Sequence, residues 1–171
     1  MPTVLIIAGP NGAGKTTFAT RWIAENAPSV AFVNADEVAR GLDDPSLSTA
    51  ERDMKAGRLT LARLDALIAA GADLVLETTL SSGLYARRIP GWKAKGYEVS
   101  LIYLRLPNVE ASIARVARRV SRGGHDVPEV DLRRRFGRSL ANLELFKPLV
   151  DDWEVWDNSA DQPALVERSA S

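Results

Sequence analysis

A glycine-rich stretch from Gly9 to Thr16 directly follows the apolar run Val4 to Ala8. Its letters, G-P-N-G-A-G-K-T, fit the phosphate-loop pattern G-x-x-x-x-G-K-[ST] between a predicted strand and a predicted helix. The glycines let backbone N–H groups point at one phosphate, Lys15 can reach the β and γ oxygens, and the Thr16 hydroxyl can ligate Mg²⁺. The pattern predicts a nucleoside triphosphate site whose binding residues are Gly9, Asn11, Gly12, Ala13, Gly14, Lys15, Thr16 and Thr17.

Two carboxylates follow other predicted strands and could face this loop. Asp36 comes after the strand-like run Val30 to Asn34, and there it could accept the proton of an attacking hydroxyl. A role for Asp36 as the N-cap of the next helix is an equal alternative. Glu77 closes the run Asp73 to Glu77 and could bind acceptor hydroxyls or order the water around Mg²⁺, although a solvated loop carboxylate is the simpler alternative.

Arginines are concentrated in one part of the chain: nine of the 17 lie between Arg105 and Arg138. Two arginine-bearing helical segments flank the loop Gly123 to Pro128, which predicts a helical lid over residues 115–138. A guanidinium group binds phosphate oxygens with two parallel hydrogen bonds, and one or two such groups would suffice for phosphoryl transfer. Most of the others are expected on solvated helix faces or paired with nearby acids, His125 is expected to hydrogen-bond within the lid, and an RNA-binding helix is a further alternative.

Three classes of phosphate-loop protein compete for this sequence. GTPases read guanine with Asn-Lys-x-Asp, and that tetrapeptide does not occur in the chain. Transporter-type ATPases carry a signature sequence, and Leu80-Ser81-Ser82-Gly83 matches only part of it. A small-molecule kinase needs a base, an acceptor pocket and mobile cations, and the sequence offers candidates for all three. A kinase is therefore the favoured class, with a non-transferring ATPase or an RNA-associated ATP switch as the alternative.

The elements that must position these residues alternate between strand and helix. Helix-like stretches between the apolar runs predict an α/β fold of the P-loop NTPase, nucleoside-kinase-like class, with a five-stranded parallel sheet and helices on both faces. Ligands of such sheets bind beyond the carboxyl ends of the strands. The expected strands lie at residues 3–8, 30–34, 73–77, 99–104 and 153–157, and the expected helices at 15–27, 48–70, 85–95 and 108–120.

Length and composition fit one globular domain over residues 1–171. The chain has no cysteine, which excludes disulfides and thiolate metal sites and fits a reducing cytoplasm. No apolar run is long enough to span a membrane, so no membrane association is expected. Lys plus Arg and Asp plus Glu are 22 each, and this balance gives no reason to expect a nucleic-acid partner.

Taken together, the stretches GPNGAGKTTFA, FVNADE, LETTL, ARVARRVSRGGHDVPEVDLRRRF and DNS resemble the zeta-toxin family of P-loop kinases, from residue 3 to about residue 159. The resemblance implies ATP-dependent phosphorylation of a hydroxyl of UDP-N-acetylglucosamine, and in some members a small antitoxin protein that blocks the nucleotide site. Compared with the larger toxins, the chain has no extension before Thr3 and few residues after the last expected strand, which leaves the acceptor open to another small metabolite or nucleoside.

The family pattern also assigns roles by position. It implies Lys15 and Thr16 on the phosphates and Mg²⁺, Asp36 as the base at the acceptor hydroxyl, and Glu77 and Thr79 on the acceptor. Lid cations are expected at Arg119 and at Arg134 or Arg135; we assign Arg119 and Arg135 to catalysis and Arg134 to the acceptor. Contacts to adenine are expected from the lid and from Asp157 to Ser159, with Asn158 as the nucleotide-binding residue.

Overall fold

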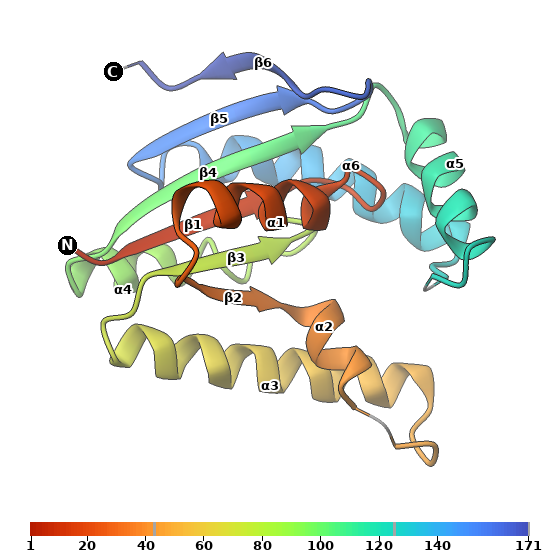
Figure 1. Ribbon diagram of the computed structural model, residues 1–171, viewed down its shortest axis with the longest axis horizontal. Coiled ribbons are helices and arrows are strands. Elements are labelled where there is room, and N and C mark those ends of the chain that lie inside the picture. The colour runs from red at the N-terminus through yellow and green to blue at the C-terminus, as the bar shows by residue number, and fades with distance from the viewer. Residues whose placement is uncertain (43, 125, 171) are drawn as a thin grey trace.

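The fold is a single mixed sheet flanked by helices, seen in a computed structural model that describes residues 1–42, 44–124 and 126–170 (Figure 1). The strand order across the sheet is β2-β3-β1-β4-β5-β6. β1 to β5 pair in parallel, and β6 pairs antiparallel with β5. The elements are β1 (Thr3–Ala8), α1 (Lys15–Asn26), β2 (Ala31–Asn34), α2 (Ala35–Arg40), α3 (Thr49–Ala69), β3 (Leu74–Thr78), α4 (Ile89–Ala94), β4 (Glu98–Arg105), α5 (Val109–Val120), α6 (Glu129–Phe146), β5 (Asp152–Asp157) and β6 (Ala164–Arg168).

The five expected strands are all present, which confirms the predicted α/β class, but the sheet has a sixth strand that the sequence did not predict. All five residues of β6 are exposed, and the strand lies at the edge of the sheet. Strands are recognised in a sequence by a buried run or by alternation of apolar and polar residues. β6 buries no side chain and therefore carries neither signal.

Apolar side chains on the two faces of the sheet form separate core clusters. On one face, Val4 and Ile6 of β1 belong to a cluster with Leu64 of α3, Trp92 of α4 and Phe146 of α6. On the other face, Leu5 and Ile7 cluster with Ala19 of α1, and Val109 at the start of α5 packs against them. Because neighbouring residues of a strand point to opposite faces, the continuous apolar run of β1 supplies both clusters.

Helix boundaries follow local capping signals. Ser48 forms a capping box with Glu51 at the start of α3, and Asn108 caps α5 by accepting a hydrogen bond from the Ala111 backbone N–H at 2.9 Å. α4 is shorter than predicted: it begins at Ile89, with Pro90 in its first turn, rather than at Tyr85. Proline is favoured in the first turn of a helix because its missing N–H is not needed there.

The parallel arrangement brings the carboxyl ends of β1 to β5 to one edge of the sheet. The glycine-rich loop after β1, helix α2 after β2 and helix α5 after β4 all lie at this edge (Figure 1). Open α/β sheets bind ligands here. Within the described residues, no helix has the length and apolar character that crossing a membrane requires.

Candidate active site

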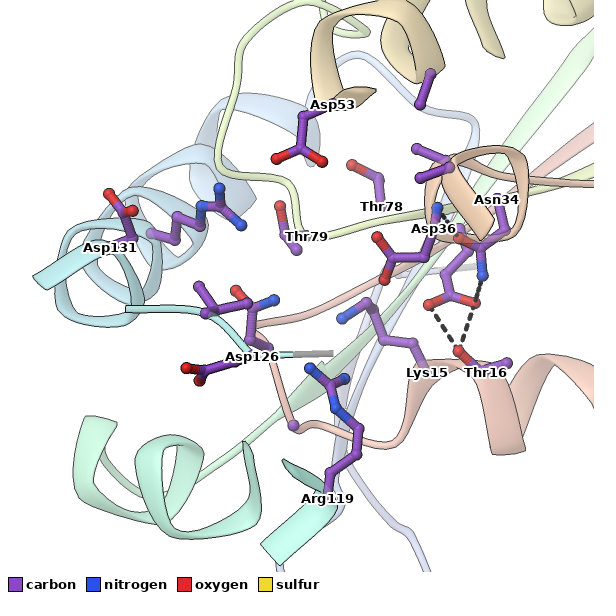
Figure 2. Close-up of a pocket in the computed structure, with 18 of the residues that line it drawn as sticks. Lys15, Thr16, Asn34, Asp36, Asp53, Thr78, Thr79, Arg119, Asp126 and Asp131 are labelled. Atoms are coloured by element: carbon purple, nitrogen blue, oxygen red, sulfur yellow. Dashed lines mark hydrogen bonds between the residues drawn. The ribbon is translucent and has the colours of Figure 1, made fainter. Parts of the chain in front are cut away.

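A cleft of about 740 Å³ opens at the carboxyl edge of the sheet, and the predicted chemistry gathers in it. The glycine-rich loop forms one side, and α2 with the first two turns of α3 forms another. The ends of β2 and β3, the segment after β3, and residues from α5, from the α5–α6 loop and from the start of α6 complete the described lining. Figure 2 shows Lys15, Asp36, Thr79 and Arg119, which come from four different elements, around one hollow.

Two positions of the loop require glycine, because neighbouring atoms leave no room for a side chain and the backbone φ is positive. A Cβ on Gly9 would lie 2.3 Å from the Leu104 carbonyl oxygen of the adjacent strand β4. Gly14 has φ +82°, and a Cβ there would lie 2.6 Å from the Asn158 amide nitrogen. A larger residue fits neither position, since backbone and a held side chain occupy the space and the left-handed conformation disfavours side chains. The loop therefore has one shape, in which α1 begins at Lys15 with its amino end toward the cleft.

Three side chains brace the loop from behind. The Ser112 hydroxyl donates to the Asn11 carbonyl at 2.6 Å, and Arg115 donates to the Gly12 carbonyl at 3.3 Å and to the Ser159 carbonyl at 2.9 Å. The Asn158 amide donates to the Ala13 carbonyl at 2.6 Å. Asn158 was predicted to contact the nucleotide directly, whereas its amide holds the loop that would contact it. These three side chains bond carbonyl oxygens and occupy none of the N–H groups of the loop, of which that of Ala13 donates to the Pro10 carbonyl at 3.1 Å.

Lys15 and Thr16 lie at the end of the loop as the motif requires. Lys15 is only 8% exposed, and its ammonium donates to the Pro10 carbonyl at 3.0 Å. The Thr16 hydroxyl lies 3.0 Å from each oxygen of the Glu77 carboxylate. Glu77 is itself 8% exposed and lies within β3, so the alternative of a solvated loop carboxylate is wrong.

Burial shifts the pKa of Lys15 and the pKa of Glu77 in the directions that favour their neutral forms. Desolvation lowers the pKa of Lys15, against the opposing attraction of Glu77 and Asp36. Desolvation raises the pKa of Glu77, against the attraction of Lys15 and the hydrogen bond from Thr16. Shifts of this kind in a cleft are typical of sites that bind a charged ligand. An anion beside Lys15 and a cation beside Glu77 would each favour the charged form.

Oxygen donors beside the loop fit a magnesium ion. A hydroxyl and a carboxylate, here Thr16 and Glu77, are the ligand types that Mg²⁺ prefers. In the part of the chain that the structure describes, no group of three or more His, Cys, Asp or Glu could hold a metal by itself. Mg²⁺ is commonly held by one or two protein groups together with substrate phosphates, and this arrangement matches that use.

Asp36 lines the cleft from the first turn of α2, with its side chain exposed. Figure 2 shows its carboxylate directed toward the Lys15 ammonium at one side of the hollow, and its negative charge raises the pKa of Lys15 against the larger effect of burial. The alternative role as N-cap is excluded, because the cap of α2 is Asn34, whose side chain accepts a hydrogen bond from the Asp36 backbone N–H at 2.8 Å. The carboxylate of Asp36 is thereby left for a ligand.

The turn after β3 presents two threonines to the cleft. Thr78 and Thr79 both line it, and the Thr79 hydroxyl shares a hydrogen bond of 2.9 Å with Ser81. The turn continues through Leu80, a fully buried residue with φ +59°. Asn142 of α6 holds this strained residue by donating to its carbonyl at 2.7 Å. A backbone conformation of this kind persists only where the surroundings enforce it.

The arginines separate into those that line the cleft and those that do not. Arg115, Arg119 and Arg135 line it, and Figure 2 shows Arg119 reaching from α5 toward Lys15. Arg134 lies outside the described lining, and its guanidinium pairs with Asp131 at 2.6 Å. The position of Arg134 therefore does not support its predicted contact with the acceptor. Consecutive residues of a helix face different directions, so Arg134 does not share the orientation of Arg135. His125 lies outside the described residues.

Other residues of the cleft were missed by sequence reasoning. Asp53 and Tyr85 line it, as do Asp126 and Asp131, which were expected only as partners of arginines. The α3 contribution consists of Thr49, Ala50, Asp53, Ala56 and Gly57, which share one face of the helix at i, i+1, i+4, i+7 and i+8. That periodicity could have identified the face, but its small and polar residues carry no catalytic motif.

A second recess adjoins the cleft on the far side of α5. It measures about 800 Å³ and shares Thr17, Arg115 and Arg119 with the cleft. Its other described lining residues come from the end of α5, the following turn and the segment after β5: Arg118, Arg122, Gly123, Gly124, Ser159, Ala160 and Asp161. The recess lies where contacts to the base of a nucleotide were predicted.

Comparison with known proteins identifies a family and similar folds. The zeta toxin family matches residues 1–160 of the chain. A cytidylate kinase of Ignicoccus hospitalis is 28% identical over 170 aligned residues, which cover 87% of this chain and 89% of the kinase. A chain of the PezAT chromosomal toxin–antitoxin system of Streptococcus pneumoniae superposes with a TM-score of 0.75 at 18% identity, over 98% of this chain and 71% of that chain. A chain of the AvrRxo1-ORF1:ORF2 complex crystallised with ATP gives a TM-score of 0.75 at 20% identity, over 98% and 58% of the two chains.

Proposed function

The chain belongs to the zeta-toxin family of P-loop kinase-like proteins, and on that premise we propose that it transfers the γ-phosphate of Mg·ATP to a hydroxyl of a small molecule. One observation carries the proposal: the exposed Asp36 carboxylate is directed toward Lys15 of the phosphate loop, in a cleft large enough for a second substrate. A protein that only bound or hydrolysed ATP would not need an acceptor cavity on the far side of the phosphates.

The nucleotide would occupy the braced side of the cleft. Backbone N–H groups of the glycine-rich loop and the amino end of α1 would hold the phosphates, as helix amino termini hold anions. Lys15 would contact the β and γ oxygens, and the base would enter the second recess. The AvrRxo1 complex was crystallised with ATP, which supports ATP as the donor to test first.

Thr16 and Glu77 would hold Mg²⁺ together with the nucleotide phosphates. The bound ion would neutralise the charge that develops on the β and γ oxygens. This assigns Glu77 to the metal and not to the acceptor, because its carboxylate lies against Thr16.

In the transfer step, Asp36 would accept the proton of the acceptor hydroxyl as the new oxygen–phosphorus bond forms. The bond between the γ-phosphorus and the β–γ bridging oxygen breaks, and ADP leaves. Arg119 and Arg135, which line the cleft from α5 and α6, would cover the moving phosphoryl group with bidentate hydrogen bonds. Positioning and electrostatic stabilisation would supply most of the rate.

For the acceptor, we propose a sugar nucleotide, with UDP-N-acetylglucosamine as the first compound to test. The resemblance to the zeta toxins suggests it, and Thr78, Thr79 and Asp53 are polar groups suited to sugar hydroxyls. The cytidylate kinase relative supports including nucleoside monophosphates in the same panel. The pneumococcal neighbour comes from a toxin–antitoxin system, which supports a search for a small protein that covers the cleft.

Incubation of the protein with Mg·ATP and a panel of acceptors tests the proposal, with mass spectrometry detecting one added phosphate on the product. We expect transfer to one class of alcohol, dependence on Mg²⁺, and loss of the product in the Lys15→Met variant. ATP binding with no transfer to sugar nucleotides, free sugars or nucleoside monophosphates would contradict it.

A further inference from the structure

Asn34 is a buried residue of the cleft that contacts both Glu77 and helix α2. It is the last residue of β2, only 4% of its surface is exposed, and it lies directly opposite Glu77 in the parallel register of β2 and β3. Side chains opposite each other in paired strands lie on the same face and can interact. The strand pairing therefore fixes Asn34 beside the carboxylate that contacts Thr16.

The two ends of the Asn34 amide bond two different parts of the site. Its Nδ2 donates to Glu77 Oε2 at 2.9 Å, and its Oδ1 accepts from the Asp36 backbone N–H at 2.8 Å (Figure 2). The first bond restrains the carboxylate beside Thr16, and the second restrains the first turn of α2. A carboxylate at position 34 could accept but not donate, and a serine hydroxyl is too short to reach Glu77 from this position.

We infer that Asn34 is a positioning residue that fixes the Glu77 carboxylate relative to helix α2, which carries Asp36. The contacts run from Thr16 through Glu77 and Asn34 to the backbone of Asp36. Groups that orient metal-binding side chains in this way typically change metal affinity or activity by about 10- to 100-fold when they are replaced. The inference rests on the proposed function, since it assigns Asn34 to the same transfer reaction.

The test needs a variant that keeps the helix cap and breaks only the bond to Glu77. Asn34→Ser meets this condition, because serine caps helices about as well as asparagine. Asn108→Ser is the matched control: Asn108 is also an asparagine N-cap, it is exposed, and it is not among the described residues of the cleft. Asn34→Ser is expected to melt a few degrees below the parent because it loses a buried hydrogen bond, so rates are compared at a temperature where both variants are fully folded.

We expect Asn34→Ser to lower kcat about 10- to 100-fold and to raise the Mg²⁺ concentration needed for half-maximal rate, and Asn108→Ser to change neither. The effect of Asn34→Ser should shrink to below about threefold in a Glu77→Ala background, because the acceptor of the Asn34 amide is then absent and Asn34 has no carboxylate to position. An unchanged kcat in Asn34→Ser, or an equal loss in both backgrounds, would overturn the inference.

Failure of the proposed function has a different signature. If the unmodified protein transfers phosphate to no acceptor, the same variants are compared by ATP affinity with Mg²⁺ and with EDTA. The inference then requires that Asn34→Ser lose most of the increase in ATP affinity that Mg²⁺ provides, and that Asn108→Ser retain it. Equal increases in the two variants would overturn it on that readout also.

Discussion

The two halves of the cleft are built differently. On the phosphate side, side chains hold the loop: the buried Ser112 and the half-buried Arg115 and Asn158 all donate to its carbonyls, and Lys15 is almost fully covered. On the acceptor side, the side chains of Asp36 and of Asp53 are exposed. The first half is therefore shaped before any ligand arrives, whereas the second is lined by side chains free to adapt to a ligand.

This difference indicates where specificity would reside. A triphosphate tail is the same in every donor, and a preformed loop binds it at little entropic cost. The acceptor differs from one kinase to another. The residues that contact it can therefore change without disturbing the phosphate loop. We expect substitutions on the two sides to have separable effects on nucleotide binding and on transfer.

The largest expected effect is on the acceptor side. Asp36→Asn removes the proposed base while keeping the size of the side chain, and transfer should fall roughly 10²- to 10⁴-fold. ATP affinity should stay within a few-fold, since the phosphates are bound by the other half. Glu37→Gln is the control, because Glu37 is the neighbouring exposed carboxylate of α2 and is absent from the described lining of the cleft. Equal transfer rates in the two variants would remove Asp36 from the mechanism.

On the phosphate side, Lys15→Met should affect binding as well as transfer. Loss of a preorganised donor to the phosphates is expected to lower transfer roughly 10²- to 10³-fold. Methionine fills a similar volume, and the ammonium it replaces is itself destabilised by burial, so the melting temperature without ligand should change little. Addition of Mg·ATP should then raise the melting temperature of the parent and of the exposed-site control Lys95→Met, but not of Lys15→Met.

The same division separates what the sequence could predict from what it could not. The loop from Gly9 to Thr16 is local, and eight consecutive residues were enough to predict a phosphate loop between a strand and a helix, although the contacts of Ser112 and Asn158 with it were not predicted. The acceptor wall is assembled from α2, α3 and α6, and no local pattern indicates that Asp53 and Asp131 meet there. Glu77 lies between these cases: its place at the end of an apolar strand was visible, but its contact with Thr16 depends on the strand order.

Arg135 and Arg134 provide an internal comparison at the start of α6. Arg135→Ala should lower transfer about 10-fold or more if its guanidinium meets the moving phosphoryl group, whereas Arg134→Ala should have almost no effect. The exposed pair of Arg134 with Asp131 contributes little to folding, so neither variant should unfold. Steady-state rates at saturating ATP distinguish the two, and a larger loss in Arg134→Ala would reverse the assignment drawn from the structure.

The smallest effects concern the rigidity of the loop. Gly9→Ala would force a Cβ against the Leu104 carbonyl and should lower the free energy of unfolding by about 1–3 kcal/mol. Gly137→Ala is the matched change in α6, where no atom lies within 4 Å of the added carbon, and removal of a helix-interior glycine should raise stability by about 0.5–1 kcal/mol. Urea unfolding of the two variants measures both the expected loss and the expected gain in the free energy of unfolding. If Gly9→Ala were as stable as the parent and still bound ATP, the loop would yield to a clash of this size, and the contrast between a preformed half and an adaptable half of the cleft would not hold.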